Sequence, residues 1–191
     1  GGERPADDLV SLLSATGRHD EALALIESLR SPGDSLPGPA DRVASALPAG
    51  EAVLSYWLLN DRLLATLLTA EGARLFSLPV RLASVATLVQ RLKVSIELDS
   101  EPLAATVLSE LYQALLAPLT SALGATHTLV IVPDRELWDV PFAGLTVRRG
   151  GAPFASHCEI AFSTSLSELM RSHQVWTKPR SILAVGDPSW D

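Results

Sequence analysis

The chain has 191 residues, enough for one domain and an appendage at roughly 150 residues per domain. Apolar residues make up 47% of it and charged residues only 19%, a balance that supplies a sizeable core and argues against a disordered chain. The net charge of -7 lacks the positive field that collects phosphates, so we expect no nucleic-acid partner.

Motif and cysteine content narrow the class of protein further. The single cysteine, Cys158, rules out an internal disulfide and fits a reducing compartment, so we expect a cytoplasmic protein. The polar, acidic residues 1–8 do not fit a signal peptide, and no run approaches the ~20 apolar residues that cross a bilayer, so we expect no membrane span. No phosphate-binding glycine motif and no metal-ligand spacing occurs, so we expect no cofactor and no metal.

Residues 1–30 predict a hairpin of two short helices. Leu9, Leu12 and Leu13 share the apolar face of the first helix, and Asp20 is placed to cap the second. The apolar face of the second helix consists of Ala22, Leu25, Ile26 and Leu29. The junction between the helices carries Leu13, Gly17, Arg18, Glu21, Ala22 and Leu23. This hairpin resembles the end of a tetratricopeptide repeat, although any helical hairpin would show the same pattern, and a lone repeat implies that others precede it.

The next segment changes its period. Residues 31–40 hold three prolines and two glycines and predict a linker, and residues 41–47 predict a short helix. Three apolar runs then follow at residues 52–59, 63–69 and 74–78, separated by the short turns Asn60-Asp61 and Glu71-Gly72. Runs this close together predict an antiparallel meander, with Tyr56 and Trp57 on opposite faces of its first strand.

Two helices are expected after Pro79. The first has an apolar stripe with steps of 3, 4, 3 and 4, and the second begins with Ser100 as its cap and Pro102 in its first turn. Pro118 should kink the last turn of the second helix before Gly124 ends it. The stripes consist of Leu82, Val85, Val89, Leu92 and Ile96, and of Leu103, Val107, Leu111, Leu115 and Leu119.

The last third alternates strands and helices. Residues 128–132, 154–163 and 181–185 predict strands, and Ser165 with Glu168 forms a capping box for a helix through about residue 175. The last of these strands is apolar on both faces, which predicts a parallel sheet covered on both sides and flanked by neighbouring strands.

Three stretches carry a resemblance to a known family. One is the meander, with Leu54, Tyr56, Asp61 and Arg62; a second is the helix with Leu111, Tyr112, Leu115, Leu116, Pro118 and Leu119. The third is the most specific: Leu129-Val130-Ile131-Val132-Pro133-Asp134, Leu137, Val140-Pro141-Phe142-Ala143-Gly144-Leu145, residues 162–169 and residues 182–188. Together these residues resemble the CHAT domain, found in bacterial caspase-like cysteine peptidases that are related to separase and often follow tetratricopeptide repeats.

The resemblance implies a fold and a division of the chain. The expected fold class is α/β: the N-terminal portion of a caspase-like α/β/α sandwich, with an antiparallel meander and a short helical hairpin in front. The expected divisions are a tetratricopeptide-like hairpin at residues 1–30, a linker at 31–40, and the N-terminal part of the CHAT domain at 41–191. The family's catalytic His and Cys stand in His-Gly and Ser-Ala-Cys contexts that this sequence lacks, so no catalytic residue is assigned to it.

Two positions invite a chemical role. His157 and Cys158 are adjacent, but neighbours in a strand point to opposite faces, so we expect Cys158 to pack as a small apolar residue. Asp187 follows the last predicted strand, where ligands bind in parallel sheets, so it is the one candidate substrate-binding residue. Its alternative role is that of a turn residue before Pro188.

Two functions remain open on the sequence. In the first, the chain is the non-catalytic N-terminal part of a caspase-like endopeptidase, inactive alone, whose partner is a C-terminal fragment or chain with the His/Cys dyad. The assembled peptidase would act on a protein substrate or be controlled by a protein regulator. In this case the chain would end at Asp191 because of a processing cut, although an artificial truncation would look the same. In the second, an inactive CHAT-like scaffold serves as a protein-interaction module.

Overall fold

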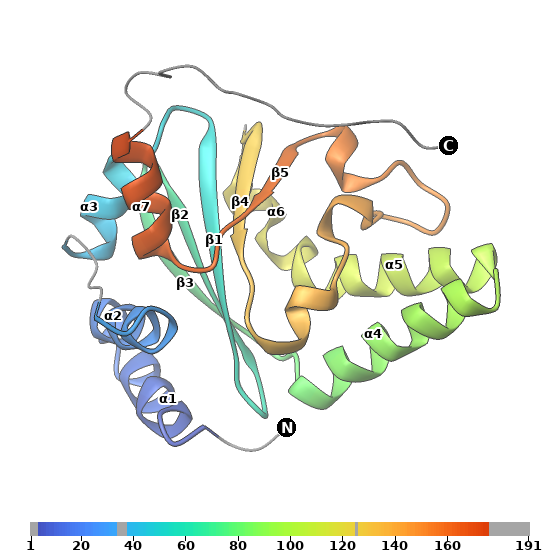
Figure 1. Cartoon of the computed structure of the whole chain (residues 1–191), viewed down its shortest axis with the longest axis horizontal. Coiled ribbons are helices and arrows are strands. Elements are labelled where there is room, and N and C mark those ends of the chain that lie inside the picture. Colours follow the sequence, from blue (N-terminus) through green and yellow to red (C-terminus); the bar gives the residue numbers. More distant parts are fainter. Residues whose placement is uncertain (1–3, 34–37, 125, 176–191) are drawn as a thin grey trace, which may run out of the picture.

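The protein is built around one five-stranded mixed sheet with the strand order β3-β2-β1-β4-β5 (Figure 1). The structure is a computed structural model that describes residues 4–33, 38–124 and 126–175. The strands are β1 (Glu51–Leu58), β2 (Leu63–Thr69), β3 (Gly72–Leu78), β4 (Thr128–Val132) and β5 (Glu159–Phe162). The helices are α1 (Asp7–Ala15), α2 (His19–Arg30), α3 (Ala40–Ser45), α4 (Leu82–Glu97), α5 (Glu101–Leu115), α6 (Thr120–Leu123) and α7 (Leu166–Val175), with 3-10 turns η1 (Ala117–Leu119), η2 (Arg135–Asp139), η3 (Phe142–Gly144) and η4 (Phe154–Ser156).

The pairing of the strands confirms the predicted meander. β1, β2 and β3 are consecutive antiparallel neighbours, with Leu58 opposite Leu63 and Thr69 opposite Gly72. β4 then pairs parallel to the other side of β1, and β5 pairs parallel to β4. The parallel pairs need a long crossover, which α4, α5 and α6 supply between β3 and β4.

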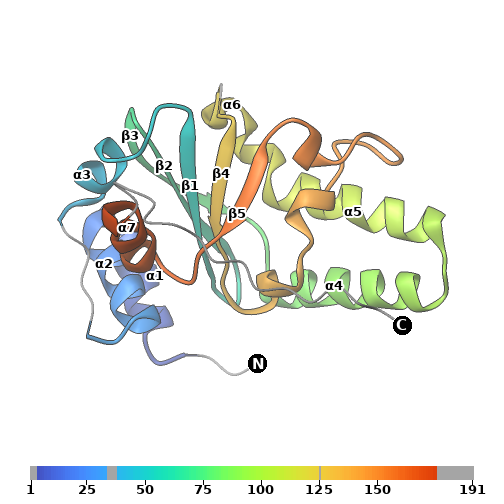
Figure 2. The ribbon, with the colours of Figure 1, turned by 45° about the horizontal axis from the view of Figure 1, so that its top comes forward.

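Helices cover both faces of the sheet, which gives the expected α/β/α sandwich. One face packs against α4 and α5 through a large apolar cluster, and the other packs against α3, α7 and the hairpin of α1 and α2. Figure 2 shows these two helical layers on opposite sides of the strands. Because both faces are covered, β1 is buried from Ala52 to Leu58.

The two aromatic residues of β1 serve the two layers. The Tyr56 ring stacks on Phe142 at 5.9 Å between centroids within the cluster on the α4–α5 face. Trp57, on the opposite face, packs with Val10 and Ile26 of the hairpin. Both aromatic side chains are buried, as their alternation along the strand predicted.

The second expected helix is interrupted near its proline rather than kinked, because α5 ends at Leu115. Pro118 has no backbone N–H to give to the preceding turn, and the chain continues from Leu115 as the 3-10 turn η1. The N–H of Leu119 donates to the Leu116 carbonyl, and the Tyr56 hydroxyl donates to the Leu115 carbonyl at 2.8 Å. A side chain of the central strand thus satisfies a carbonyl at the end of this helix.

The stretch Glu101–Leu123 is long and apolar enough, by length and composition alone, to cross a membrane. In the structure it is not one continuous helix, because η1 separates α5 from α6. One side of it is buried in the core through Val107, Leu111 and Leu115. A core helix of this kind meets the same compositional test.

Several expected details of the N-terminal hairpin are wrong. Leu9 and Leu12 are exposed, and α1 buries Val10 and Leu13 instead. Asp20 lies inside the first turn of α2, where its carboxylate accepts the N–H of Ala40 at 3.0 Å and so caps α3. The apolar stripes also end short, because Leu29 and Ile96 are exposed.

Two further expectations need correction near the end of the described chain. The strand expected over residues 154–163 is shorter, because residues 154–156 form η4 before β5 begins at Glu159. Half of the predicted capping box forms, since Ser165 Oγ accepts the N–H of Glu168 at 3.0 Å. The Glu168 carboxylate accepts the hydroxyl of Thr164 instead of returning to the cap.

We expect Tyr56→Phe to lower the free energy of unfolding by about 1–2 kcal/mol, because it leaves the buried Leu115 carbonyl without this donor. Urea unfolding followed by circular dichroism measures the loss. Tyr112→Phe is the matched control, since that hydroxyl lies 3.4 Å from Thr120 Oγ1 and is only partly buried. Equal losses in the two variants would contradict the role given to Tyr56.

Candidate functional site

The carboxyl ends of the parallel strands β1, β4 and β5 meet at one edge of the sheet, where ligands bind in sheets of this kind. A hollow of about 320 Å³ lies at this end beside β5 and α7. Its lining consists of Trp138, Phe162, Ser163, Thr164, Glu168, Leu169 and Ser172.

The hollow exposes aromatic surface. Trp138 is 50% exposed and Phe162 is 49% exposed. The Phe162 ring approaches the buried Phe142 ring at 6.2 Å between centroids. Trp138 and Phe162 line the same hollow, so their exposed aromatic surfaces lie close together.

β5 also presents a free edge within the described residues, because it pairs with β4 alone. The Glu159 N–H donates to the His127 carbonyl at 2.8 Å, and the Ser163 N–H donates to the Ile131 carbonyl at 3.0 Å. Backbone groups alternate along a strand, so those of Ile160 and Phe162 point away from β4. This edge can therefore accept another strand.

A buried ionic network holds the turn that follows β4. Asp134 accepts the N–H of Leu58 at 2.8 Å and two N–H groups of the Arg4 guanidinium at 2.8 and 3.0 Å. Arg4 also donates to Asp7 at 3.0 Å, and its guanidinium carbon lies 3.5 Å from the centre of the Trp57 ring. The Pro-Asp turn of the sequence is thus tied to the segment in front of α1.

Asp7 is the second anion of this network. It is 6% exposed and accepts the Trp57 indole N–H at 3.1 Å and a guanidinium N–H of Arg135 at 3.1 Å. Arg135 has φ +51°, in the left-handed region that L residues rarely adopt. The ion pair with Asp7 therefore helps to hold a strained residue at the start of η2.

A buried carboxylate from α2 caps the helix that follows β5. Glu27 is fully buried, and its Oε2 accepts the N–H groups of Leu166 at 2.8 Å and Ser167 at 3.3 Å. Its Oε1 accepts Arg30 at 3.1 Å, and Arg30 in turn donates to Ser55 Oγ at 2.8 Å. Burial lowers the pKa of Arg30 while the Glu27 charge raises it. The negative charge also suits the N-terminal end of the α7 dipole.

Sequence reasoning missed these polar residues. Asp7 and Glu27 stand in ordinary helical sequence and Arg4 lies just before α1, and each has a partner more than a hundred residues away along the chain. A charged residue on the apolar side of α2 was the only available signal, and an exposed helix face would explain it equally well.

His157 and Cys158 do not form a catalytic pair. They lie between η4 and β5 rather than inside a strand, which corrects their expected position. Cys158 is a buried member of the apolar core, burial raises the pKa of its thiol, and its Sγ donates to the Glu159 carbonyl at 3.5 Å. The exposed His157 ring lies 3.0 Å from Ser156 Oγ. The expectation that Cys158 packs as an apolar residue is confirmed.

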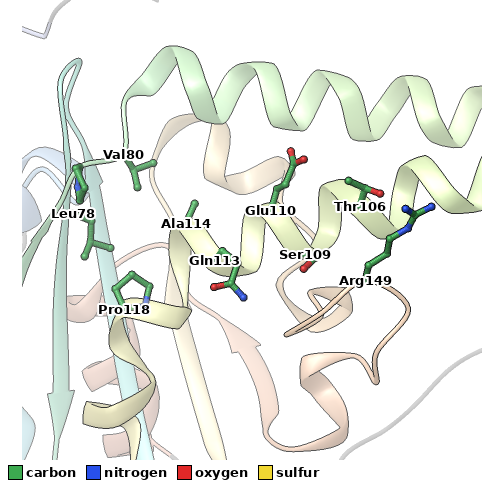
Figure 3. Close-up of a pocket in the computed structure, with 10 residues that line it drawn as sticks. Leu78, Val80, Thr106, Ser109, Glu110, Gln113, Ala114, Pro118 and Arg149 are labelled. Atoms are coloured by element: carbon green, nitrogen blue, oxygen red, sulfur yellow. The ribbon is translucent and has the colours of Figure 1, made fainter.

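A larger hollow of about 580 Å³ lies between α5, the β3–α4 connection and the loop that carries Arg149. Figure 3 shows Thr106, Ser109, Glu110 and Gln113 along α5 on one side of it. Glu110 is already paired with Arg91 at 2.6 Å, and Gln113 donates to the Val147 carbonyl at 2.9 Å. Glu110, the carboxylate of the lining, is thus held in an ion pair.

The candidate substrate-binding residue Asp187 stays a prediction. Asp187 and the expected strand at residues 181–185 lie outside the described residues. Within residues 4–33, 38–124 and 126–175, no group of three or more His, Cys, Asp or Glu side chains is arranged to hold a metal ion.

The family comparison decides the identity of the C-terminal half. Residues 105–191 match the model of the CHAT domain. This part of the chain is CHAT-domain sequence. The match covers β4, β5 and α7, which surround the candidate site. No curated protein matches the chain. The match begins within α5, so the likeness of the N-terminal hairpin to a tetratricopeptide repeat stays a prediction.

Because burial raises the pKa of its thiol, Cys158 should react with iodoacetamide at pH 8 at least about ten-fold more slowly in the folded protein than in urea. Intact-mass measurement over time follows the alkylation. His157→Ala should leave the folded-state rate unchanged, since the imidazole is not bonded to the thiol. A slower reaction in His157→Ala would show that the two residues do interact.

Proposed function

We propose that this chain is the non-catalytic N-terminal part of a CHAT caspase-like cysteine endopeptidase. It forms one wall of a cleft that a C-terminal part, carrying the catalytic His and Cys, completes. In such enzymes His acts as base and Cys as nucleophile, and backbone N–H groups stabilise the oxyanion. The described residues contain no such pair, and the proposal gives them a scaffolding role.

The free edge of β5 carries this proposal. Its outward backbone groups at Ile160 and Phe162 lie next to the half-exposed Trp138 and to the hollow at the carboxyl ends of the parallel strands. An incoming strand would satisfy the backbone groups and cover the aromatic surface in one step. The CHAT match supports a peptidase as the source of that strand.

The handedness of the chain connections indicates where the strand that pairs with β5 comes from. Crossovers between parallel strands of one sheet are right-handed in nearly all proteins. The β1–β4 crossover runs through α4 and α5 on one face, whereas α7 lies on the other face. A right-handed connection through α7 would therefore turn back toward β4. We expect a strand from further along the protein, or from a second polypeptide, to fill the edge.

The direct test compares this chain with the product of the complete gene. The chain alone should cleave no peptide or protein and should not react with a thiol-directed peptidyl electrophile. The complete product should label at one cysteine outside residues 1–191, and mutation of that cysteine should abolish both labelling and cleavage. A complete product that lacks a reactive cysteine would overturn the proposal and favour an inactive, protein-binding scaffold.

The second test blocks the edge without breaking the sheet. Ile160→Pro removes an N–H that points away from β4 and places a ring where the new strand would lie. We expect it to lower association with a separately expressed C-terminal part by at least about ten-fold, as judged by titration calorimetry. Ile160→Ala is the control, because it loses the same side-chain packing but keeps the N–H. Equal binding by the two variants would exclude β5 as the joining edge.

A further inference from the structure

Two buried polar joints connect the N-terminal hairpin to the candidate site. In the first joint, Asp7 holds Arg135 and so reaches the turn after β4. In the second joint, Glu27 holds the N–H groups of Leu166 and Ser167 at the start of α7, after β5. The hairpin therefore contacts both turns that flank the hollow at the carboxyl ends of the sheet.

We propose that the hairpin of α1 and α2 sets the conformation of these two turns together, with Asp7 and Glu27 as its positioning residues. Neither residue lines the hollow, so each acts through the backbone or side chain that it holds. Helices α1 and α2 pack on each other, and Val10 and Ile26 share one buried cluster, so we expect the hairpin to move as one body. Displacing it would release both turns at once.

The Glu27–Arg30 ion pair does not prevent the hairpin from leaving the sheet. Glu27 and Arg30 are both on α2 and are paired to each other at 3.1 Å, so the ion pair leaves with the hairpin. At the second joint, Arg30 donates to a hydroxyl and a carbonyl oxygen of β1 and lies 5.7 Å from the centre of the Trp57 ring, and none of these partners is charged. A buried pair that returns to water together regains its hydration, which offsets part of the cost of opening.

At the first joint the ion pair is divided between the hairpin and η2, so moving the hairpin separates Asp7 from Arg135. Asp7 leaves the sheet with the hairpin, and Arg135 then loses the ion pair that helps to hold its left-handed backbone. Arg135 begins η2, which carries Trp138 into the hollow three residues later. Whether the hairpin is packed on the sheet therefore determines how well Trp138, which lines the candidate site, is held in place.

Hydrogen exchange measured by mass spectrometry tests the coupling. In Glu27→Gln we expect exchange at residues 166–170 to rise about ten-fold, because α7 loses a charged cap. We also expect exchange at residues 134–139 to rise, although Glu27 does not contact them. Glu21→Gln is the matched control, since Glu21 is an exposed residue of the same helix paired with Arg18. It should change neither region.

The distant turn separates this proposal from a purely local cap. Faster exchange at 166–170 with unchanged exchange at 134–139 would show that Glu27 merely caps α7 and would overturn the proposal. Exchange in β1 and β2 is the folding control and should stay slow in every variant.

A second variant serves if Glu27→Gln unfolds. Ser31 Oγ and Ser165 Oγ lie 3.0 Å apart, so Ser31→Cys/Ser165→Cys can link the end of α2 to the start of α7 by a disulfide. The oxidised protein should exchange more slowly than the reduced protein at residues 134–139. Identical exchange in the two redox states would refute the coupling.

Discussion

The structure depends on β1 being sealed on both faces and paired on both edges. β1 joins the antiparallel meander to the parallel half of the sheet, and its residues from Ala52 to Leu58 are buried. A strand that is buried on both faces does not tolerate charged side chains along its length. Polar neighbours are needed only where a backbone N–H or C=O group has no partner in an adjacent strand. Asp134 and Arg30 meet that need at Leu58 and Tyr56, beside the end of the strand. The two layers and the ionic network therefore meet at the same place.

The spacing of apolar residues predicted most helices and strands, because in each of them the apolar residues recur at a regular interval. The meander, α4 and α5 follow from alternating and helical spacing, and Pro118 marked the break after α5. The errors came where helix faces are shared with tertiary partners. Leu9, Leu12 and Ile96 satisfied a helical stripe but face outward, because the sheet contacts a narrower part of each helix than its apolar residues would allow.

The candidate site was less accessible to sequence reasoning. The hollow beside Trp138 and Phe162 arises because η2 and β5 lie side by side, and no spacing in the sequence brings those residues together. Glu27 and Asp7 were invisible for the same reason, since a buried carboxylate is recognised only once its partners are placed around it. Cys158 packs in the core as expected, although the alternation along a strand from which this was argued does not apply, because Cys158 lies before β5.

The outer edges of β3 and β5 differ in how their free backbone groups are covered. On β3, the Ala73 N–H that points outward is already taken by the Asp41 carboxylate of α3 at 2.9 Å, and Arg74 adds a charge along the strand. β5 has no comparable capping contact among the described residues and leaves aromatic surface beside it. Left uncovered, a strand of this kind recruits copies of itself, so the protein should stay dispersed only while that side is occupied. Solubility during synthesis would then depend on how soon the covering strand arrives.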